Sequence, residues 1–324
     1  MKRILIAGAN PYNANRGVAA LAYSTMCMID DIFSVEGVDY ELCVYNHEFR
    51  KTFDWIETPT KKIHFQNVYP SDILSIKSFF RTLFSRWRLY NLRELLKADI
   101  ILNITAGDSF SDIYGETNFI SQNKINCLAR LFHKKVLFLP QTYGPFQPNS
   151  AVQKAAIKSL RNAIGIFSRD TESTEYLETL GLKNVVNSID MAFYLPYRSQ
   201  YKERNDIRIG INVSKTLWEK CKEHKFELQI DYPMCICQII QHLLSKGFQV
   251  HLISHVVDSR NIEDLGYHYN LDLTKNLVND DLINKIEEMI GKRDLIRQQI
   301  ETINNTIVRN YIQDLKSRLK AILS

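Results

Sequence analysis

The sequence lacks the features that would assign it to a membrane-spanning or a zinc-binding class. No apolar run is longer than about a dozen residues, whereas a membrane-spanning helix needs roughly 20. Met1–Gly8 is too short for a signal peptide and is typical of a first core strand. The 6 cysteines are scattered, and the close pair Cys235 and Cys237 lacks the two-residue gap of metal and redox sites. We therefore expect a cytoplasmic protein with reduced thiols and no metal site.

Signatures of nucleotide and nucleic-acid binding are also missing. The spacing from Gly8 to Gly17 fits neither the Rossmann fingerprint nor the P-loop. The net charge is only +5, and no nucleic-acid-binding module accompanies the basic residues, so we expect no nucleic-acid partner. The loop from Gly8 to Gly17 nevertheless precedes a predicted helix, and a helix amino terminus favours a phosphate group.

Much of the positive charge is gathered in residues 77–93, where basic residues are interleaved with aromatic and aliphatic ones. The basic members are Lys77, Arg81, Arg86, Arg88 and Arg93. Two interpretations stay open. The segment is either a peripheral contact with the anionic inner face of the membrane or a surface helix whose aromatic face covers the core.

Length and pattern predict an α/β fold with two Rossmann-like domains. A chain of 324 residues with 45% apolar residues can build two cores. A strand, loop and helix pattern begins at Lys2 and again at Arg208, which gives domains at 1–197 and 207–324 and a linker at 198–206. The second domain is short: after His255 only residues 267–271 are strand-like, and residues 279–324 are typical of helices. We expect it to be truncated and to end in helices.

The most informative stretch is an apolar run at residues 100–104 that changes abruptly to small and acidic residues before a helical pattern near Phe119. Gly107 would let the backbone approach a ligand. Asp108, Ser109, Ser111 and Asp112 offer two carboxylates and two hydroxyls to a polyhydroxylated or phosphorylated ligand. Asp108 or Ser109 could instead cap the next helix, although one cap needs only one residue.

Polar residues follow the neighbouring predicted strands as well. Gln141 and Thr142 come after the strand-like residues 135–139, and Arg169 comes after residues 164–167. An arginine at a strand end can bind a carboxylate or phosphate in a forked pair, and the alternative is a salt bridge to Asp170 or Glu172. Because the carboxyl ends of parallel strands meet at one edge, we expect Asp108, Ser109, Gln141 and Arg169 to converge on one pocket.

Together these motifs resemble the polysaccharide pyruvyl transferase family. The matching segments are 15–17, 107–115, 140–146, 168–170, 190–193, 209–212 and 252–255. The resemblance implies a GT-B-like fold and the transfer of pyruvate from phosphoenolpyruvate to a sugar of an exopolysaccharide or bacterial cell-surface glycan, as a ketal. It implies phosphoenolpyruvate as donor substrate, a lipid-linked or polymeric sugar as acceptor, and no cofactor.

The resemblance also implies residue roles. Asp108 or Asp112 would hold or deprotonate the acceptor hydroxyl, and His255, at the end of a predicted strand, would be the remaining imidazole for proton transfer. Arg169 would bind the donor anion. The other predicted substrate contacts are Asn15, Arg16, Gly107, Ser109, Gln141 and Thr142.

The family pattern is interrupted after His255. Only residues 256–262 separate it from Glu263, where family members carry several tens of residues that include an arginine and a histidine expected to bind phosphoenolpyruvate and protonate its methylene. The resemblance therefore implies impaired activity. Two alternatives stay open: a GT-B glycosyltransferase that uses a nucleotide sugar, and a degenerate, non-catalytic glycan-binding subunit.

Overall fold

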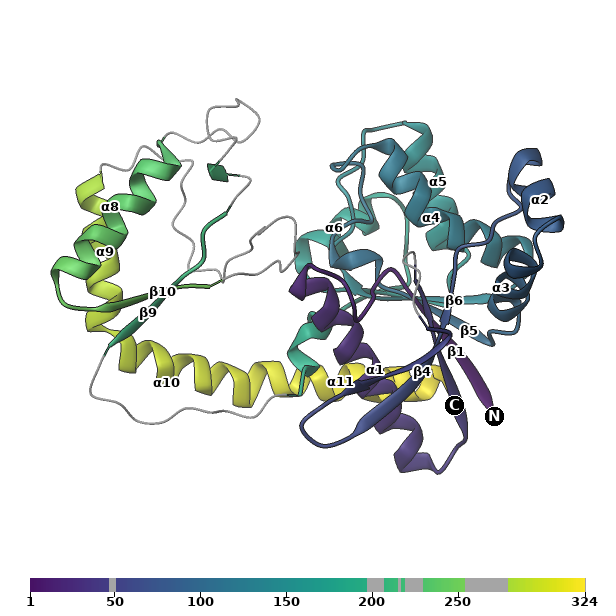
Figure 1. Ribbon diagram of the computed structural model, residues 1–324, viewed down its shortest axis with the longest axis horizontal. Helices are drawn as coiled ribbons and strands as arrows, with labels where there is room; N and C mark the ends of the chain where they lie inside the picture. The colour runs from purple at the N-terminus through teal and green to yellow at the C-terminus, as the bar shows by residue number, and fades with distance from the viewer. Residues whose placement is uncertain (47–50, 197–206, 215–216, 219–229, 254–278, 324) are drawn as a thin grey trace. The chain divides into compact units, whose positions relative to one another are not determined.

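A computed structural model describes residues 1–46, 51–196, 207–214, 217–218, 230–253 and 279–323 (Figure 1). The chain forms two compact units. The first contains Met1–Asn13, Gly17–Arg198 and Ile307–Ser324, and the second contains Ala14–Arg16 and Ser199–Thr306.

The first unit is built on an eight-stranded sheet with the order β3-β4-β2-β1-β5-β6-β7-β8. The strands are β1 (Lys2–Ala7), β2 (Tyr40–Tyr45), β3 (Phe53–Glu57), β4 (Lys62–Val68), β5 (Ile100–Asn103), β6 (Lys135–Gln141), β7 (Gly165–Ser168) and β8 (Val185–Asn187). Only the edge pair β3 and β4 is antiparallel within this sheet. The strand order reverses between β1 and β5, so this is the topological switch point at which ligands bind in such sheets.

Helices cover both faces of the sheet, which is why its central strands are apolar throughout. On one face, Ile4 and Ile6 pack against α1 (Arg16–Glu36). On the other face, Leu5 and Ala7 share a core with residues of α3 (Arg86–Leu96), α4 (Glu116–Leu131), α5 (Ala151–Arg161) and α6 (Thr171–Thr179). Helix α1 is long and apolar enough to cross a membrane, but its apolar side chains are mostly buried in the core that it shares with Ile4 and Ile6. The predicted α/β fold is confirmed.

The C-terminal helix α11 (Arg309–Leu323) belongs to the first unit, whereas the sequence analysis assigned it to the second domain. Leu315, Leu319 and Leu323 are fully buried in the same core as α1, and Figure 1 shows α11 beside α1. The reason is geometric: α4, α5 and α6 all cover the opposite face, and α11 helps to cover the side of β5–β7 that they leave open. The structure thus groups Ile307–Ser324 with the first unit, and the boundaries expected from the sequence stay a prediction.

The described part of the second unit is small. Strands β9 (Arg208–Ile211) and β10 (Gln249–Leu252) pair in parallel and are joined through α8 (Tyr232–Ser245), and they are followed by α9 (Asn279–Gly291) and α10 (Arg293–Ile303). A turn of π-helix at Asn304–Val308 leads into α11. Among its described residues this unit has two strands, against eight in the first. The predicted strand at 267–271 lies outside the described residues.

Candidate functional site

Two loops meet in backbone contact at the switch point of the first sheet. The amide of Ala106 donates to the carbonyl of Gly8 at 2.6 Å. A Cβ on Gly8 would lie 2.3 Å from the backbone nitrogen of Thr105, and Gly8 has a φ of +86°, so only glycine fits here. The close approach fixes the loop after β5 against the loop after β1.

The turn that follows β5 is held in place by a buried aromatic side chain. Phe110 is 1% exposed, and its ring contacts four other aromatic rings, those of Phe119, Phe138, Tyr143 and Phe146. Three residues before it, Gly107 has a φ of +88°. The polar residues on either side of Phe110 are therefore presented by a backbone whose position is set by the core.

Asp108 lies in a small hydrogen-bonded cluster. Tyr114 Oη donates to Asp108 Oδ2 at 2.8 Å, and Ser109 Oγ donates to Oδ1 at 3.2 Å. Burial, then the hydrogen bond to Asp108, raises the pKa of Tyr114 to about 12, so this phenol stays protonated at neutral pH. Neither Asp108 nor Ser109 caps the next helix, because the N-cap of α4 is Gly115 and has no side-chain cap. The capping alternative is wrong.

Asp112 and Ser111 connect this turn to the loop after β6. Asp112 Oδ2 accepts from the amide of Gln147 at 2.7 Å, and Ser111 Oγ donates to the carbonyl of Pro145 at 3.1 Å. One carboxylate oxygen of Asp112 is therefore engaged in holding two loops together. Its predicted catalytic role stays a prediction.

Gln141 and Thr142 lie at the end of β6, but they face different surroundings. The side chain of Gln141 is fully buried, and its Nε2 donates to Tyr143 Oη at 3.2 Å and to the carbonyl of Asn103 at 3.4 Å. In the structure Gln141 therefore supports the loop, and its predicted contact with the substrate stays a prediction. The amide of Thr142 donates to the carbonyl of Gly107 at 2.8 Å, which joins the loops after β5 and β6.

Arg169 is the centre of the polar network. Its Nε donates to Thr142 Oγ1 at 2.8 Å and its Nη1 to Asp190 Oδ2 at 2.7 Å. The carboxylate partner is therefore Asp190, and the predicted alternatives Asp170 and Glu172 are wrong. Asp170 instead caps α6 by accepting from the amide of Ser173 at 2.6 Å, and it accepts from Thr142 Oγ1 at 3.0 Å.

One edge of the guanidinium remains available. The side chain of Arg169 is 29% exposed, and its Nη2 donates to no residue that the structure describes. A Cβ on Gly107 would lie 3.1 Å from Arg169 Nη1 and 2.9 Å from Leu21 Cδ1. The missing side chain at residue 107 thus makes room for the arginine. An oriented guanidinium with an unoccupied N–H edge can bind a carboxylate or a phosphate.

The predicted site residues are brought together in part. Asp108, Ser109, Thr142 and Arg169 follow three adjacent parallel strands, β5, β6 and β7, and therefore lie at one edge of the sheet. Asn15 and Arg16 stand at the start of α1 and are grouped with the second unit. His255 lies outside the described residues. The roles of these three residues stay predictions.

Two members of the network were not among the predicted site residues. Asp190 comes shortly after β8, just as Arg169 comes after β7. Its position after a short strand was the sequence feature that could have indicated a site residue. Tyr114 lies in the same polar turn as Asp108, six residues later, and its aromatic character gave no indication of a hydrogen bond to the carboxylate. Within the described residues, no group of three or more His, Cys, Asp or Glu side chains could hold a metal ion.

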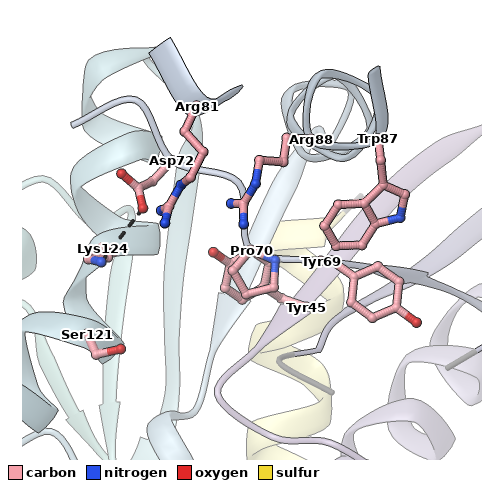
Figure 2. A pocket seen from close by; sticks show the side chains of 9 residues that line it. All are labelled: Tyr45, Tyr69, Pro70, Asp72, Arg81, Trp87, Arg88, Ser121 and Lys124. Atoms are coloured by element: carbon pink, nitrogen blue, oxygen red, sulfur yellow. Dashed lines mark ion pairs between the residues drawn. The ribbon is translucent and has the colours of Figure 1, made fainter. Parts of the chain in front are cut away.

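A cavity of about 350 Å³ lies on the other side of the switch point, at the carboxyl ends of β2 and β4 (Figure 2). It is lined by Tyr45, Tyr69, Pro70, Asp72, Arg81, Trp87, Arg88, Ser121 and Lys124. Lys124 Nζ lies 3.6 Å from Asp72 Oδ2, and Figure 2 shows Arg81 and Arg88 pointing into the same space. With three cations and one carboxylate, the lining carries a net positive charge. None of the predicted site residues lines it.

The first unit is thus a doubly wound α/β domain with an arginine-centred polar site at the carboxyl edge of its sheet. The sequence model of the polysaccharide pyruvyl transferase family matches residues 15–292. The chain belongs to this family.

Among solved structures, the chain is similar to a UDP-N-acetylglucosamine 2-epimerase, with 11% sequence identity and a TM-score of 0.37. The similarity covers 78% of this chain and 68% of the epimerase chain. No curated protein matches the chain.

Proposed function

We propose that this protein is a ketal pyruvate transferase that moves pyruvate from phosphoenolpyruvate to a sugar of an exopolysaccharide or cell-surface glycan. The observation that carries the proposal is Arg169, which Asp190 and Thr142 orient and whose Nη2 edge is available to an anion. Phosphoenolpyruvate offers both a carboxylate and a phosphate to such a group. Family membership supports the same activity.

The reaction needs two sugar hydroxyls and one donor. Two C–O bonds form between the sugar oxygens and C2 of phosphoenolpyruvate, the C2–O bond to phosphate breaks, and the methylene becomes a methyl group. The two sugar hydroxyls lose two protons in total. The methylene gains one proton, and the released hydrogen phosphate carries the other. A base for the hydroxyls, an acid for the methylene and cations for the donor are the groups that accelerate these steps.

In this proposal Asp108 holds the acceptor hydroxyl and takes its proton, and Arg169 binds the donor. Tyr114 and Ser109 donate to Asp108 and so fix the orientation of its carboxylate. The acceptor is a lipid-linked or polymeric sugar. His255, outside the described residues, is the proposed proton donor to the methylene.

We further propose that this chain transfers pyruvate poorly while still binding the sugar acceptor in its first unit. The support is the interruption of the family pattern after His255, together with the two strands among the described residues of the second unit. Losing a forked arginine contact to a buried anion costs on the order of 2 to 5 kcal/mol, or roughly thirty- to several-thousand-fold in affinity. Losing a proton donor costs a further ~10²- to 10⁴-fold in rate.

The test is an assay of phosphoenolpyruvate-dependent ketal formation on candidate bacterial glycans, with phosphate release as a second readout. The chain is compared with a version in which the family's missing segment is inserted after His255. We expect faster turnover from the restored version. Equal turnover by the two would show that the segment is dispensable and would refute the proposal of impaired activity.

The second candidate is a non-catalytic glycan-binding subunit, which the interruption of the family pattern after His255 also favours. It differs from the first in one outcome of the same assay. A non-catalytic subunit binds the glycan acceptor but forms no ketal even when the segment is restored, whereas an impaired transferase regains activity.

A further inference from the structure

A surface helix usually packs its apolar side against the protein and exposes its polar side. Helix α2 (Ile76–Leu83) packs its polar side against the first unit instead. Its buried side chains are those of Ser78 and Thr82. Thr82 Oγ1 donates to the carbonyl of Asp72 at 2.9 Å, and Ser78 forms a capping box with Ser75. The helix is therefore held down by hydrogen bonds from its polar side.

The apolar side of the same helix points outward. Ile76 and Phe84 are 81% and 82% exposed, and Phe79, Phe80 and Leu83 are exposed as well. The rings are continuous: the Phe79 and Phe80 centroids are 5.6 Å apart, and Phe80 stacks on Phe84 at 6.3 Å. We call these five residues the outward face. Exposed apolar patches of this kind mark interaction surfaces.

The next helix, α3, shows that this arrangement is local. Leu92 and Leu95 of α3 are buried and Leu95 belongs to the core of that face, although Trp87, Leu89 and Tyr90 of the same helix are exposed. Helix α3 therefore covers the core with part of its apolar surface. The two interpretations of residues 77–93 therefore apply to different helices. Helix α3 covers the core, and α2 is left with an uncovered apolar side.

The charge around the outward face is of one sign. Residues 73–93 contain no Asp or Glu. They contain five cations, Lys77, Arg81, Arg86, Arg88 and Arg93. None of the five forms an ion pair within the part of the chain that the structure describes. Two of them, Arg81 and Arg88, line the positively charged cavity below the helix.

We propose that α2 docks the protein onto an anionic membrane surface, with the outward face inserted among the lipid headgroups and the surrounding cations paired with lipid phosphates. An interfacial helix requires this combination of exposed aromatic side chains and flanking Lys and Arg. The excess of positive charge in residues 73–93 is complementary to the inner leaflet and opposes docking onto a basic protein surface. The inference goes beyond the proposed transferase activity and does not depend on it.

The test is co-sedimentation of the full chain with vesicles of phosphatidylglycerol or of phosphatidylcholine. We expect binding to phosphatidylglycerol that weakens as salt is added and little binding to phosphatidylcholine. The double variant Arg81→Gln with Arg86→Gln should bind phosphatidylglycerol roughly 25-fold more weakly, at about fivefold for each cation removed. The double variant Phe80→Ser with Phe84→Ser should lose roughly tenfold or more.

Matched controls separate docking from general effects of charge and apolarity. Lys158→Gln with Arg161→Gln removes two exposed cations from α5, and Phe53→Ser removes an equally exposed aromatic side chain from β3. Both controls should bind like the wild type, and thermal unfolding should be unchanged in the α2 variants because their side chains are exposed. Equal binding to the two lipids, or equal losses in the α2 and control variants, would overturn the proposal.

Discussion

The two halves of the carboxyl edge of the first sheet are constructed differently. Beyond β5, the loops pack around the buried ring of Phe110, and the arginine at the edge is bound by a threonine and an aspartate. Beyond β2 and β4, the loops leave a cavity of about 350 Å³ into which Arg81 and Arg88 point, and its lining contains one carboxylate, that of Asp72, close to Arg81. Both halves carry cations, but they hold them differently: two side chains bind Arg169 at 2.7 and 2.8 Å, whereas in the second half the described ion pair is the longer Lys124–Asp72 contact of 3.6 Å.

The difference separates two kinds of anion recognition. An arginine that is oriented in advance pays little conformational entropy when it binds and can select a planar anion, as a catalytic site needs. Arginines that no ion pair orients can attract anions of many shapes, as a membrane-facing surface needs. In the two proposals, arginine thus serves specificity on one half and attraction on the other.

The largest expected effect concerns the packing of the two halves. Phe110→Ala should destabilise the protein by about 3 to 5 kcal/mol, because it empties a fully buried position among aromatic rings. Trp87→Ala, in the wall of the cavity, should cost only about 1 to 2 kcal/mol, since Trp87 is 44% exposed. Denaturant unfolding measures both. Similar losses would mean that the two halves are equally packed.

The second effect concerns the donor. Arg169→Gln should weaken binding of phosphoenolpyruvate by roughly thirty- to several-thousand-fold, since the charge-assisted contact from Nη2 is lost. Arg169→Lys should not restore it, because a compact ammonium cannot contact Thr142, Asp190 and the anion in the geometry of the planar guanidinium. Lys124→Gln, which removes a cation from the other half, serves as the control and should leave the affinity unchanged. Calorimetric titration distinguishes the variants, and equal weakening by Arg169→Gln and Lys124→Gln would argue against two distinct halves.

The third effect isolates the close approach at Gly107. Gly107→Ala and Gly115→Ala both place an alanine at positive φ, +88° and +94°, but an added Cβ would meet atoms within 4 Å only at residue 107. We expect Gly107→Ala to be more destabilising by about 1 to 3 kcal/mol, the usual cost of overpacking. Unfolding free energies of the pair give the difference. If the two substitutions lower the free energy of unfolding equally, the position of Arg169 does not depend on the space beside Gly107.

The smallest effect is a pH dependence of the Asp108 and Tyr114 pair. Burial and Asp108 raise the pKa of Tyr114 from 10.0 to about 12. The stabilisation linked to this shift is fully present below pH 10 and is lost as the pH rises from 10 towards 12, because the unfolded phenol ionises first. Tyr114→Phe should cost about 0.5 kcal/mol at pH 8, since the hydrogen bond is exposed. The cost should shrink at pH 11, and an undiminished cost there would exclude the assigned pairing.

The sequence predicted the first half better than the second because the first half is made of local patterns. An apolar run followed by Gly107 and Asp108 identifies a strand end, and parallel strands bring such ends to one edge. The partner of Arg169 was not predictable in this way, since Asp190 follows a different strand and its contact depends on the strand order. The burial of Gln141 was missed because a residue that ends a strand can face either the interior or a ligand.

Two helices show a further limit of pattern analysis. The apolar period of α2 is clear, but a period does not say which side of a helix is buried, and in α2 the buried side carries Ser78 and Thr82. In α11 the buried side chains of Leu315, Leu319 and Leu323 are separated by charged residues, so the sequence predicts a helix without indicating which unit it covers. Both outcomes depend on tertiary packing.

The most direct test of the difference between the two halves is a crystal structure of the full chain soaked with phosphoenolpyruvate. We expect a donor carboxylate or phosphate oxygen within hydrogen-bond distance of Arg169 Nη2, with the Asp190 and Thr142 contacts to the arginine retained. Donor density bound instead by Arg81, Arg88 and Lys124 in the cavity beyond β2 and β4, with none at Arg169, would contradict the account.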